Sequence, residues 1–253
     1  MGYIERCIES ISFADEIIVV DSFSTDGTYE YLLNHPKVEV IQRRFLNFTD
    51  QKSYALKRAS NDWVLFVDAD EVVTSNLKSE IVETINSKNG HSAYWFYRKF
   101  MYQNRPLHFS GWQTDKNHRL FKKSKVRFTS ERLVHETLQV DGSSGKFNER
   151  LTHFCFKNFE DYKGKMLHYG TLKAREELNK GRRFSYAKMV VKTSWKFFYN
   201  FVLRLGFLDA ERGFNVCYLN ALSVYKRYHE LQRLEQLHHT PVLTKVIQKH
   251  KLA

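Results

Sequence analysis

A chain of 253 residues with 42% hydrophobic and 15% aromatic side chains can build a substantial core, which excludes a disordered or linker-rich protein. Its formal net charge is +12, and the surplus lies in residues 91–253, whereas residues 1–90 are slightly acidic. This excess favours an anionic partner, namely a nucleotide phosphate, a nucleic acid or an acidic lipid surface, with simple solubility as the alternative.

The first part of the chain alternates helical and β-strand patterns. Such alternation predicts an α/β fold whose sheet is mostly parallel and whose crossovers are right-handed. The predicted elements are a helix at 2–12, a buried strand at 16–20, a helix capped by Thr25 or Asp26, a strand at 38–42, a helix at 49–60 and a buried strand at 63–67.

The second part of the chain becomes helical. A helix is expected at 75–88, a strand at 93–102, loops and short strands over 103–155, and helices at 160–180, 184–204 and 210–238. We therefore predict one domain at 1–155 and a basic helical extension at 156–253. The apolar stretch at 189–208 is interrupted by three basic residues and makes a poor membrane span, and no signal peptide is expected.

Three carboxylates crowd the end of the strand in DWVLFVDADE, at Asp68, Asp70 and Glu71. Like charges this close raise one another's pKa unless a cation compensates them. Alternation along an extended chain points Asp68 and Asp70 the same way, and oxygen ligands suit Mg²⁺ or Mn²⁺ shared with substrate phosphates. The alternative is a set of acids that favour the start of the next helix.

Asp21 also ends a predicted strand. In an open parallel sheet, ligands bind beyond the carboxyl ends of the strands. We therefore expect Asp21 and the three acids of residues 68–71 to face one crevice.

Several segments together resemble family 2 glycosyltransferases, which have the GT-A fold. The most specific are EIIVVDSFSTDGT (16–28) and QKSYALKRASNDWVLFVDADE (51–71), while HRLFKK (118–123) and RLVHE (132–136) are weaker. The segment GFLDAERGF (206–214) resembles the bacterial subgroup that builds the lipopolysaccharide core. The resemblance implies a Rossmann-like, mostly parallel sheet flanked by helices, with a C-terminal helical extension.

The resemblance also implies how a nucleotide-sugar is bound. Asp70 is the better candidate for a metal ligand, Asp68 would contact the ribose or help hold the metal, and Glu71 would support these ligands or touch the sugar. Asp21 would contact the nucleotide, although the second acid found beside it in many members is Ser22 here. The implied cofactor is Mg²⁺ or Mn²⁺.

Three further residues have two interpretations each. Lys52 would reach a phosphate or be a solvated lysine. Arg119, within HRLFKK, would assist the leaving diphosphate or form a surface ion pair. Trp112 would stack on a sugar face or belong to the core.

The implied reaction is an inverting displacement, in which an acceptor hydroxyl attacks C1 of the sugar as the nucleoside diphosphate leaves. It needs a base near the nucleophile. Glu136 is the candidate base, Glu131 is the reserve, and His135 would contact the metal or a phosphate.

Family members begin with an apolar strand that precedes a helix like GYIERCIESI, whereas this sequence starts at the helix. We therefore expect a sheet that lacks this first strand, exposes a strand edge and has an incomplete nucleotide pocket.

The helical extension interleaves basic and aromatic residues over 173–198. Such a helix can lie on an anionic membrane, and the alternative is a solvated charged face. No nucleic-acid recognition motif is present, so nucleic acid is not an expected partner. The expected function is a hexosyl- or heptosyltransferase acting on a lipid-linked or polysaccharide acceptor, cytoplasmic and peripheral on the inner face of the cytoplasmic membrane. The alternatives are a non-catalytic membrane-associated binding module and a nucleotidyltransferase, although the glycine-rich loop expected of the latter is missing.

Overall fold

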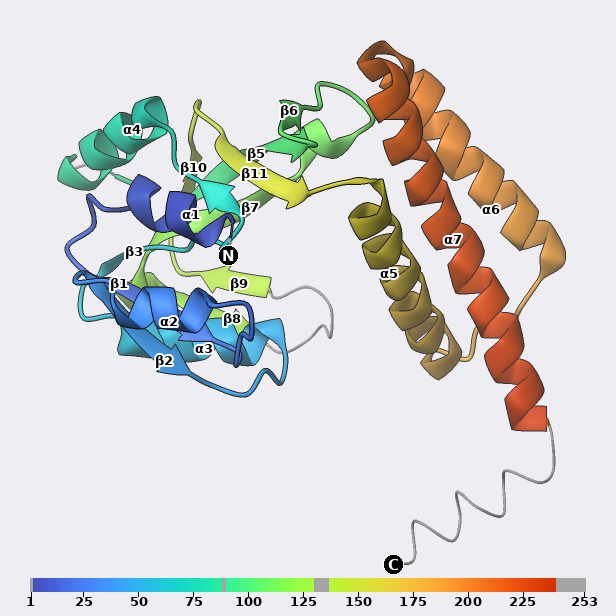
Figure 1. The fold of residues 1–253 in the computed structure, drawn as a ribbon, viewed down its shortest axis with the longest axis horizontal. Coiled ribbons are helices and arrows are strands. Elements are labelled where there is room, and N and C mark those ends of the chain that lie inside the picture. The colour runs from blue at the N-terminus through green and yellow to red at the C-terminus, as the bar shows by residue number, and fades with distance from the viewer. Residues whose placement is uncertain (1, 88–89, 130–136, 240–253) are drawn as a thin grey trace, which may run out of the picture. The chain divides into compact units, whose positions relative to one another are not determined.

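In the computed structural model the chain forms two compact units (Figure 1). The first unit comprises Met1–Phe100 and Thr114–Cys155, and the second comprises Met101–Gln113 and Phe156–Ala253. Within them, the residues described are 2–87, 90–129 and 137–239. The predicted domain boundaries stay a prediction, and the structure groups residues 101–113 with the helical unit instead of the first.

The first unit opens with the predicted alternation of helices and strands. β1 and β2 pair in parallel, with Ile17 opposite Val38 and Asp21 opposite Gln42. The elements are α1 (Ile4–Ser10), β1 (Ile17–Asp21), α2 (Thr28–Leu33), β2 (Val38–Gln42), α3 (Phe48–Arg58) and β3 (Trp63–Leu65). The side chain of Asn47 caps α3 by accepting a hydrogen bond from the Asp50 amide, at 2.9 Å.

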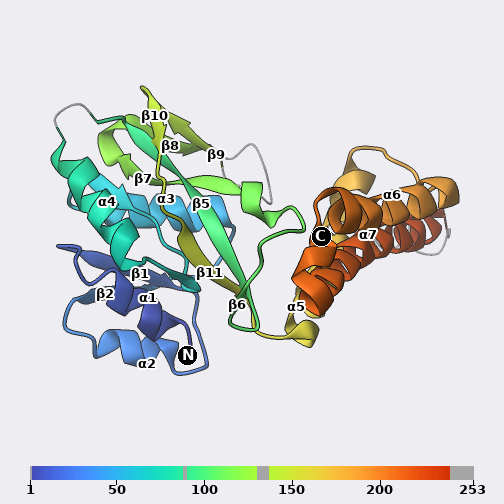
Figure 2. The same ribbon diagram turned by 90° about the horizontal axis from the view of Figure 1, so that it is seen from above.

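The rest of the first unit supplies most of a larger sheet, whose strands follow the order β3-β7-β5-β11-β4. β7 is antiparallel to both β3 and β5, so these two strands run in the same direction on either side of it. Figure 2 shows β5 and β11 side by side. The predicted α/β class is confirmed. The sheet is mixed because β7 runs antiparallel to both of its neighbours. The elements are β4 (Glu71–Val72), α4 (Ser75–Asn86), β5 (Ala93–Tyr102), β7 (Lys116–Lys122), β8 (Val126–Thr129), β9 (Thr137–Val140), β10 (Ser144–Lys146) and β11 (Leu151–Phe156).

The sheet is interrupted between β1 and β3. Among the described residues, β1 pairs only with β2, and β3 pairs only with β7. Each therefore has one unpaired edge among these residues. Ile18–Val20 and Trp63–Val67 are partly buried, although the sequence predicted buried strands. The prediction was wrong in this respect because a strand with a neighbour on one edge keeps open surface along the other.

Three apolar clusters hold the first unit together. One surrounds Leu77 and Phe96 under the larger sheet, a second contains Ile8 and Leu32 beneath β1, and a third packs Phe121 between α3 and β8. Burial of side chains this large is the main stabilising contribution to such a unit. The clusters fix the ends of β3, β4 and β7, where the charged residues of the candidate site lie.

The second unit is a helical assembly in which α7 packs against both α5 and α6 (Figure 1). None of the helices described in the chain is long and apolar enough to cross a membrane. The elements are β6 (Arg105–Pro106), η1 (Trp112–Thr114), α5 (Phe159–Asn179), α6 (Tyr186–Phe198), the π-helix η3 (Tyr199–Leu203), the 3₁₀ helix η4 (Gly206–Asp209) and α7 (Ala210–His239).

Candidate active site

The crowded carboxylates at the end of β3 surround a buried arginine. Arg119 Nη2 lies 2.5 Å from Asp68 Oδ2 and 2.6 Å from Glu71 Oε1. Arg119 reaches them because β7 pairs with β3, and its carbonyl accepts the Phe66 amide at 2.7 Å. Arg119 is 3% exposed and Glu71 is fully buried, so this is an internal ion pair and not the surface pair that the sequence also allowed.

Two more cations approach the same carboxylates. Arg98 Nη1, on β5, lies 3.6 Å from Glu71 Oε1, and Lys52 Nζ, on α3, lies 3.8 Å from Asp68 Oδ1. The positive charge that the carboxylate crowding predicted is therefore supplied at least in part by the protein itself. The amide of Asp68 donates to Glu71 Oε2 at 2.9 Å, which folds the DADE segment into a tight turn.

The environment separates the acidities of these two carboxyls. Burial raises the pKa of Asp68, but the charges of Arg119 and Lys52 outweigh it and hold that pKa well below its usual range. Burial raises the pKa of Glu71, and Arg119 offsets this only in part. Asp68 therefore keeps its charge at neutral pH more readily than Glu71 does.

Asp70 is the carboxylate of this group that is least engaged with arginine or lysine. Its side chain is 36% exposed, and its Oδ2 lies 3.3 Å from His153 Nε2. β4 and β11 place His153 opposite Glu71, and the Phe154 amide donates to the Asp70 carbonyl at 2.8 Å. The Asp70 carboxylate is thus partly exposed, with His153 as its neighbour.

The donor chemistry fits a hard cation that is shared with a ligand. In the described part of the chain, no group of three or more His, Cys, Asp or Glu side chains could hold a metal unaided. Asp70 and Asp68 present carboxylate oxygens, and Mg²⁺ is commonly bound by one or two carboxylates together with substrate phosphates. A divalent cation would therefore need phosphate oxygens or waters to complete its coordination here.

Asp21 is closed within its own turn. It is 5% exposed, and its carboxylate accepts hydrogen bonds from the Ser24 amide at 3.1 Å and the Ser24 hydroxyl at 2.5 Å. This arrangement shapes the loop after β1, and the neighbouring Asp26 accepts the Thr28 amide at 3.2 Å.

Helix α3 connects the ends of β1 and β3. Gln51 Nε2 donates to the Val20 carbonyl at 3.0 Å and to the Ser22 hydroxyl at 3.1 Å. The next residue, Lys52, contacts Asp68 at the end of β3. Because consecutive residues of one helix reach both strand ends, these ends lie at one edge of the unit. That Asp21 shares a crevice with the acids of residues 68–71 stays a prediction.

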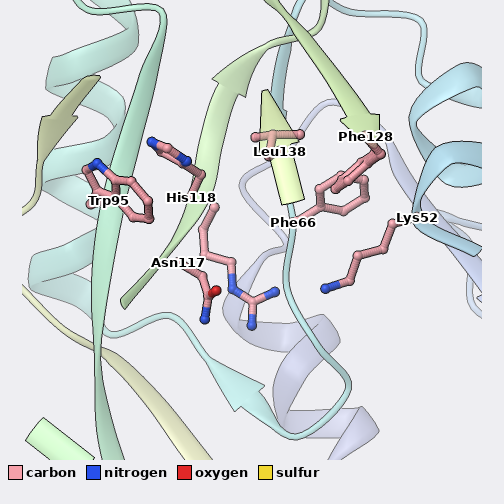
Figure 3. A pocket seen from close by; sticks show the side chains of 8 residues that line it. Lys52, Phe66, Trp95, Asn117, His118, Phe128 and Leu138 are labelled. Carbon is pink, nitrogen blue, oxygen red and sulfur yellow. The ribbon is translucent and has the colours of Figure 1, made fainter. Parts of the chain in front are cut away.

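A cavity of about 140 Å³ opens beside Arg119 and Lys52. The Trp95 and His118 rings stack with centroids 3.5 Å apart, and Figure 3 shows Lys52 and Asn117 pointing toward the same space. Burial, with nearby Lys116, lowers the pKa of His118 to about 4. The cavity combines charged, amide and aromatic surfaces, which suits a polar ligand with a flat face. Its lining residues are Lys52, Phe66, Trp95, Asn117, His118, Arg119, Phe128 and Leu138.

The remaining predicted residues are three that the structure does not describe and Trp112. Glu131, His135 and Glu136 lie outside the described residues. Trp112 belongs to the second unit, where its ring packs edge-on near Phe156, with centroids 6.2 Å apart.

Comparison with known proteins gives the family. Residues 2–138, which include the acidic cluster and all the residues that line the cavity, match the sequence profile of Glycosyl transferase family 2. The chain belongs to this family. It is a glycosyltransferase by that membership, and the resemblance found in its sequence is confirmed.

Similar proteins span nearly the whole chain of this glycosyltransferase. An uncharacterized glycosyltransferase of Rickettsia bellii is 30% identical over 244 residues, covering 91% of this chain and 82% of that protein. The lipopolysaccharide core biosynthesis glycosyltransferase LpsC of Rhizobium meliloti is 26% identical over 239 residues, covering 90% and 88%. The crystal structure of S. aureus TarS 1–349 in complex with UDP aligns with a TM-score of 0.44 at 16% identity, covering 92% of this chain and 88% of that one.

Sequence reasoning missed several residues of this glycosyltransferase's site. Arg98 could have been noticed in the sequence, because it is a charged residue within the largely apolar stretch AYWFYRKFMY. Its partner could not, because the partner depends on strand register. His153 had none, because only the pairing of β11 with β4 brings it to Asp70. Gln51 lies next to Lys52 in the segment 51–71, which resembles family 2 glycosyltransferases, but nothing in the sequence indicated its contact with the end of β1.

Proposed function

We propose that this glycosyltransferase moves a sugar from a nucleotide-sugar donor to a cell-envelope glycolipid or polysaccharide. The observation that carries the proposal is the turn after β3, in which Asp68 contacts Arg119 and Lys52 of the cavity while the neighbouring Asp70 carboxylate is partly exposed. The LpsC relative supports an envelope acceptor, and a hexosyl- or heptosyltransferase fits that class of product. The reaction we propose is a direct displacement that inverts the anomeric carbon.

The donor diphosphate would lie between Asp70 and the cations. We propose that Asp70, with help from Asp68, holds Mg²⁺ or Mn²⁺ against the diphosphate. When bound, the cation would neutralise the charge that develops on the leaving group. Asp21 and the loop after β1 would form the nucleoside side of the site, and Glu71 would act by holding Arg119.

Arg119 and Lys52 would stabilise the leaving diphosphate directly. Arg119 is already fixed by Asp68 and Glu71, so it would not need to reorient as charge develops, and such preorganised groups are the most effective. Lys52 Nζ lies 3.8 Å from Asp68 Oδ1, and Lys52 lines the same cavity as Arg119. In the displacement, the acceptor oxygen bonds to C1 while the C1–diphosphate bond breaks.

The acceptor hydroxyl must lose its proton as it attacks. We propose Glu136 as the base, with Glu131 in reserve and His135 as a contact to the phosphate or the metal. Trp112 as a sugar contact also stays a proposal. A lipid-linked acceptor would place the enzyme on the inner face of the cytoplasmic membrane.

A panel of nucleotide-sugars tests this function. Release of nucleoside diphosphate would be followed with Mn²⁺, with Mg²⁺ and with EDTA, with and without lipid-extract acceptors. We expect turnover of one donor, and a loss of about a hundred-fold or more in kcat/KM for Asp70→Ala. The matched control is Asp141→Ala, which removes an aspartate whose side chain is 81% exposed and which lies outside the site. Full turnover by Asp70→Ala would show that the proposed role of Asp70 is wrong.

A further inference from the structure

Helix α6 turns an apolar face to solvent. Val191 is 65% exposed and Trp195 is 56% exposed, and the exposed Phe198 lies on the same side of the helix. The opposite side is already used, since Phe197 packs edge-on against Phe214 of α7 with centroids 5.8 Å apart. Apolar faces this large on a helix that is already packed mark an interaction site.

The apolar surface continues past the end of α6. The chain from η3 to η4 exposes Leu203, Leu205, Phe207 and Leu208. The Phe207 ring lies 6.2 Å from Phe201, which in turn stacks on Phe197 of α6. The exposed tip is therefore adjacent to the helix within the same unit.

The tip is held rigidly. Asp209 is buried and accepts hydrogen bonds from the His108 amide at 3.1 Å and the Phe109 amide at 2.8 Å. Gly213 and Gly206 touch so closely that a Cβ at Gly213 would overlap the Gly206 carbonyl oxygen. The apolar side chains are therefore presented by a fixed backbone.

The segment that carries this surface has charge of one sign, although Lys180 and Arg182 pair with Glu176 and Glu177 of α5. Residues 180–208 contain no Asp or Glu, and their seven basic residues are Lys180, Arg182, Arg183, Lys188, Lys192, Lys196 and Arg204. Lys188 and Lys192, one turn apart, are exposed along one side of the apolar face, whereas Lys196 is partly buried near Cys217 of α7. An apolar face bordered by such a row is typical of helices that lie in a membrane interface.

We propose that the outer face of α6 and the 203–208 tip dock into an anionic lipid surface. Val191, Trp195, Phe198, Phe207 and Leu208 would enter the interface, and the lysines would contact lipid phosphates. A second copy of the chain is the weaker candidate because two patches of one charge sign repel each other. Nucleic acid is weaker still, because valine, leucine and phenylalanine side chains would be buried against phosphates.

This inference deepens the proposed function by naming the surface that meets a lipid-linked acceptor. Its test measures binding without turnover, so it can fail independently of the proposed chemistry. The full chain would be floated with phosphatidylcholine vesicles with and without phosphatidylglycerol. We expect binding only to the anionic vesicles, and weaker binding as salt is raised.

Two pairs of variants separate the apolar and the basic contributions. Val191→Ser with Trp195→Ser should weaken binding at least ten-fold, whereas Leu33→Ser with Val82→Ser, at exposed positions of α2 and α4, should leave it unchanged.

Lys188→Gln with Lys192→Gln should weaken binding roughly thirty-fold. The matched control, Lys99→Gln with Lys146→Gln, removes the same charge from exposed positions of the first unit and should have little effect.

Three outcomes would overturn the proposal. The first is equal binding to neutral and to anionic vesicles. The second is an equal loss of vesicle binding in the test and the control variants. The third is a concentration-dependent dimer, or a complex with single-stranded RNA, in a chain that does not bind vesicles. Thermal unfolding of each variant would be compared with that of the unchanged chain, to check that a variant with weaker binding is still folded.

Discussion

At the residue scale, Arg119 is the group on which the acidic cluster depends. It touches Asp68 and Glu71, and Glu71 is fully buried. Arg119→Met keeps the length of the side chain but leaves a buried carboxyl without its closest cation. Breaking a buried pair in this way typically costs about 3 to 5 kcal/mol, so we expect a loss of this order in the free energy of unfolding measured with urea.

Arg127→Met is the matched control. Arg127 is exposed on β8 and donates to Gln139 at 2.6 Å, so its loss should leave the free energy of unfolding nearly unchanged. Adding Glu71→Gln to Arg119→Met should recover part of the lost stability, because the buried group is then neutral. Equal effects of Arg119→Met and Arg127→Met would contradict the internal ion pair.

His118 predicts a pH dependence. Burial, with Lys116, lowers its pKa to about 4 in the folded chain, below the ordinary value of 6.5. As pH falls from 6.5 toward 4, His118 takes up a proton in the unfolded chain but stays neutral in the folded chain. The contribution of His118 to the free energy of unfolding is therefore present above pH 6.5 and is lost as pH falls toward 4. His118→Phe keeps a ring against Trp95. It should reduce the fall in the free energy of unfolding between pH 6.5 and 4 by roughly 1 to 2 kcal/mol.

Urea titrations of the unchanged chain and of His118→Phe at several pH values between 7.5 and 4 would measure the difference. An identical fall in stability for the two proteins would show that the pKa of His118 is not lower in the folded chain than in the unfolded chain.

The site was predictable from sequence where residues stand at strand ends. Asp68, Asp70 and Glu71 follow an apolar strand directly, so their clustering could be predicted without tertiary contacts. Arg98 and His153 could not be assigned partners, because the pairing of β5 and β11 with other strands decides what they touch. The internal neutralisation of the cluster is thus a property of the fold.

At the element scale, the order of helices and strands in the first unit follows from periodicity alone, whereas strand direction does not. The reversed direction of β7 arises from tertiary pairing, and so does the partial burial of β1 and β3, whose facing edges are free among the described residues. Local patterns report which face of an element is apolar and carry no information on its neighbours.

Glycines of two helices give a prediction at the same scale. Gly213, near the start of α7, touches the Gly206 backbone, whereas a Cβ at Gly164 in α5 would meet nothing within 4 Å. Alanine favours helix by about 1 kcal/mol over glycine. We therefore expect Gly164→Ala to stabilise the protein and Gly213→Ala to destabilise it by about 1 to 3 kcal/mol through overpacking. Circular dichroism melts would show shifts of opposite sign, and shifts of the same sign would contradict the contact.

At the scale of the whole molecule, each compact unit has its own core. The first contains three apolar clusters. In the second, the Phe156 and Tyr162 rings stack with centroids 3.5 Å apart, and Leu219 and Leu231 of α7 are buried. Units with separate cores can unfold in separate transitions. We therefore expect two transitions in differential scanning calorimetry of the full chain.

The variants described above assign these transitions. Arg119→Met should lower the midpoint of one transition, and Gly213→Ala should lower the other, because each change lies within a different unit. The Lys99→Gln and Lys146→Gln control should move neither. A single transition that both Arg119→Met and Gly213→Ala lower would show that the two cores unfold as one cooperative body.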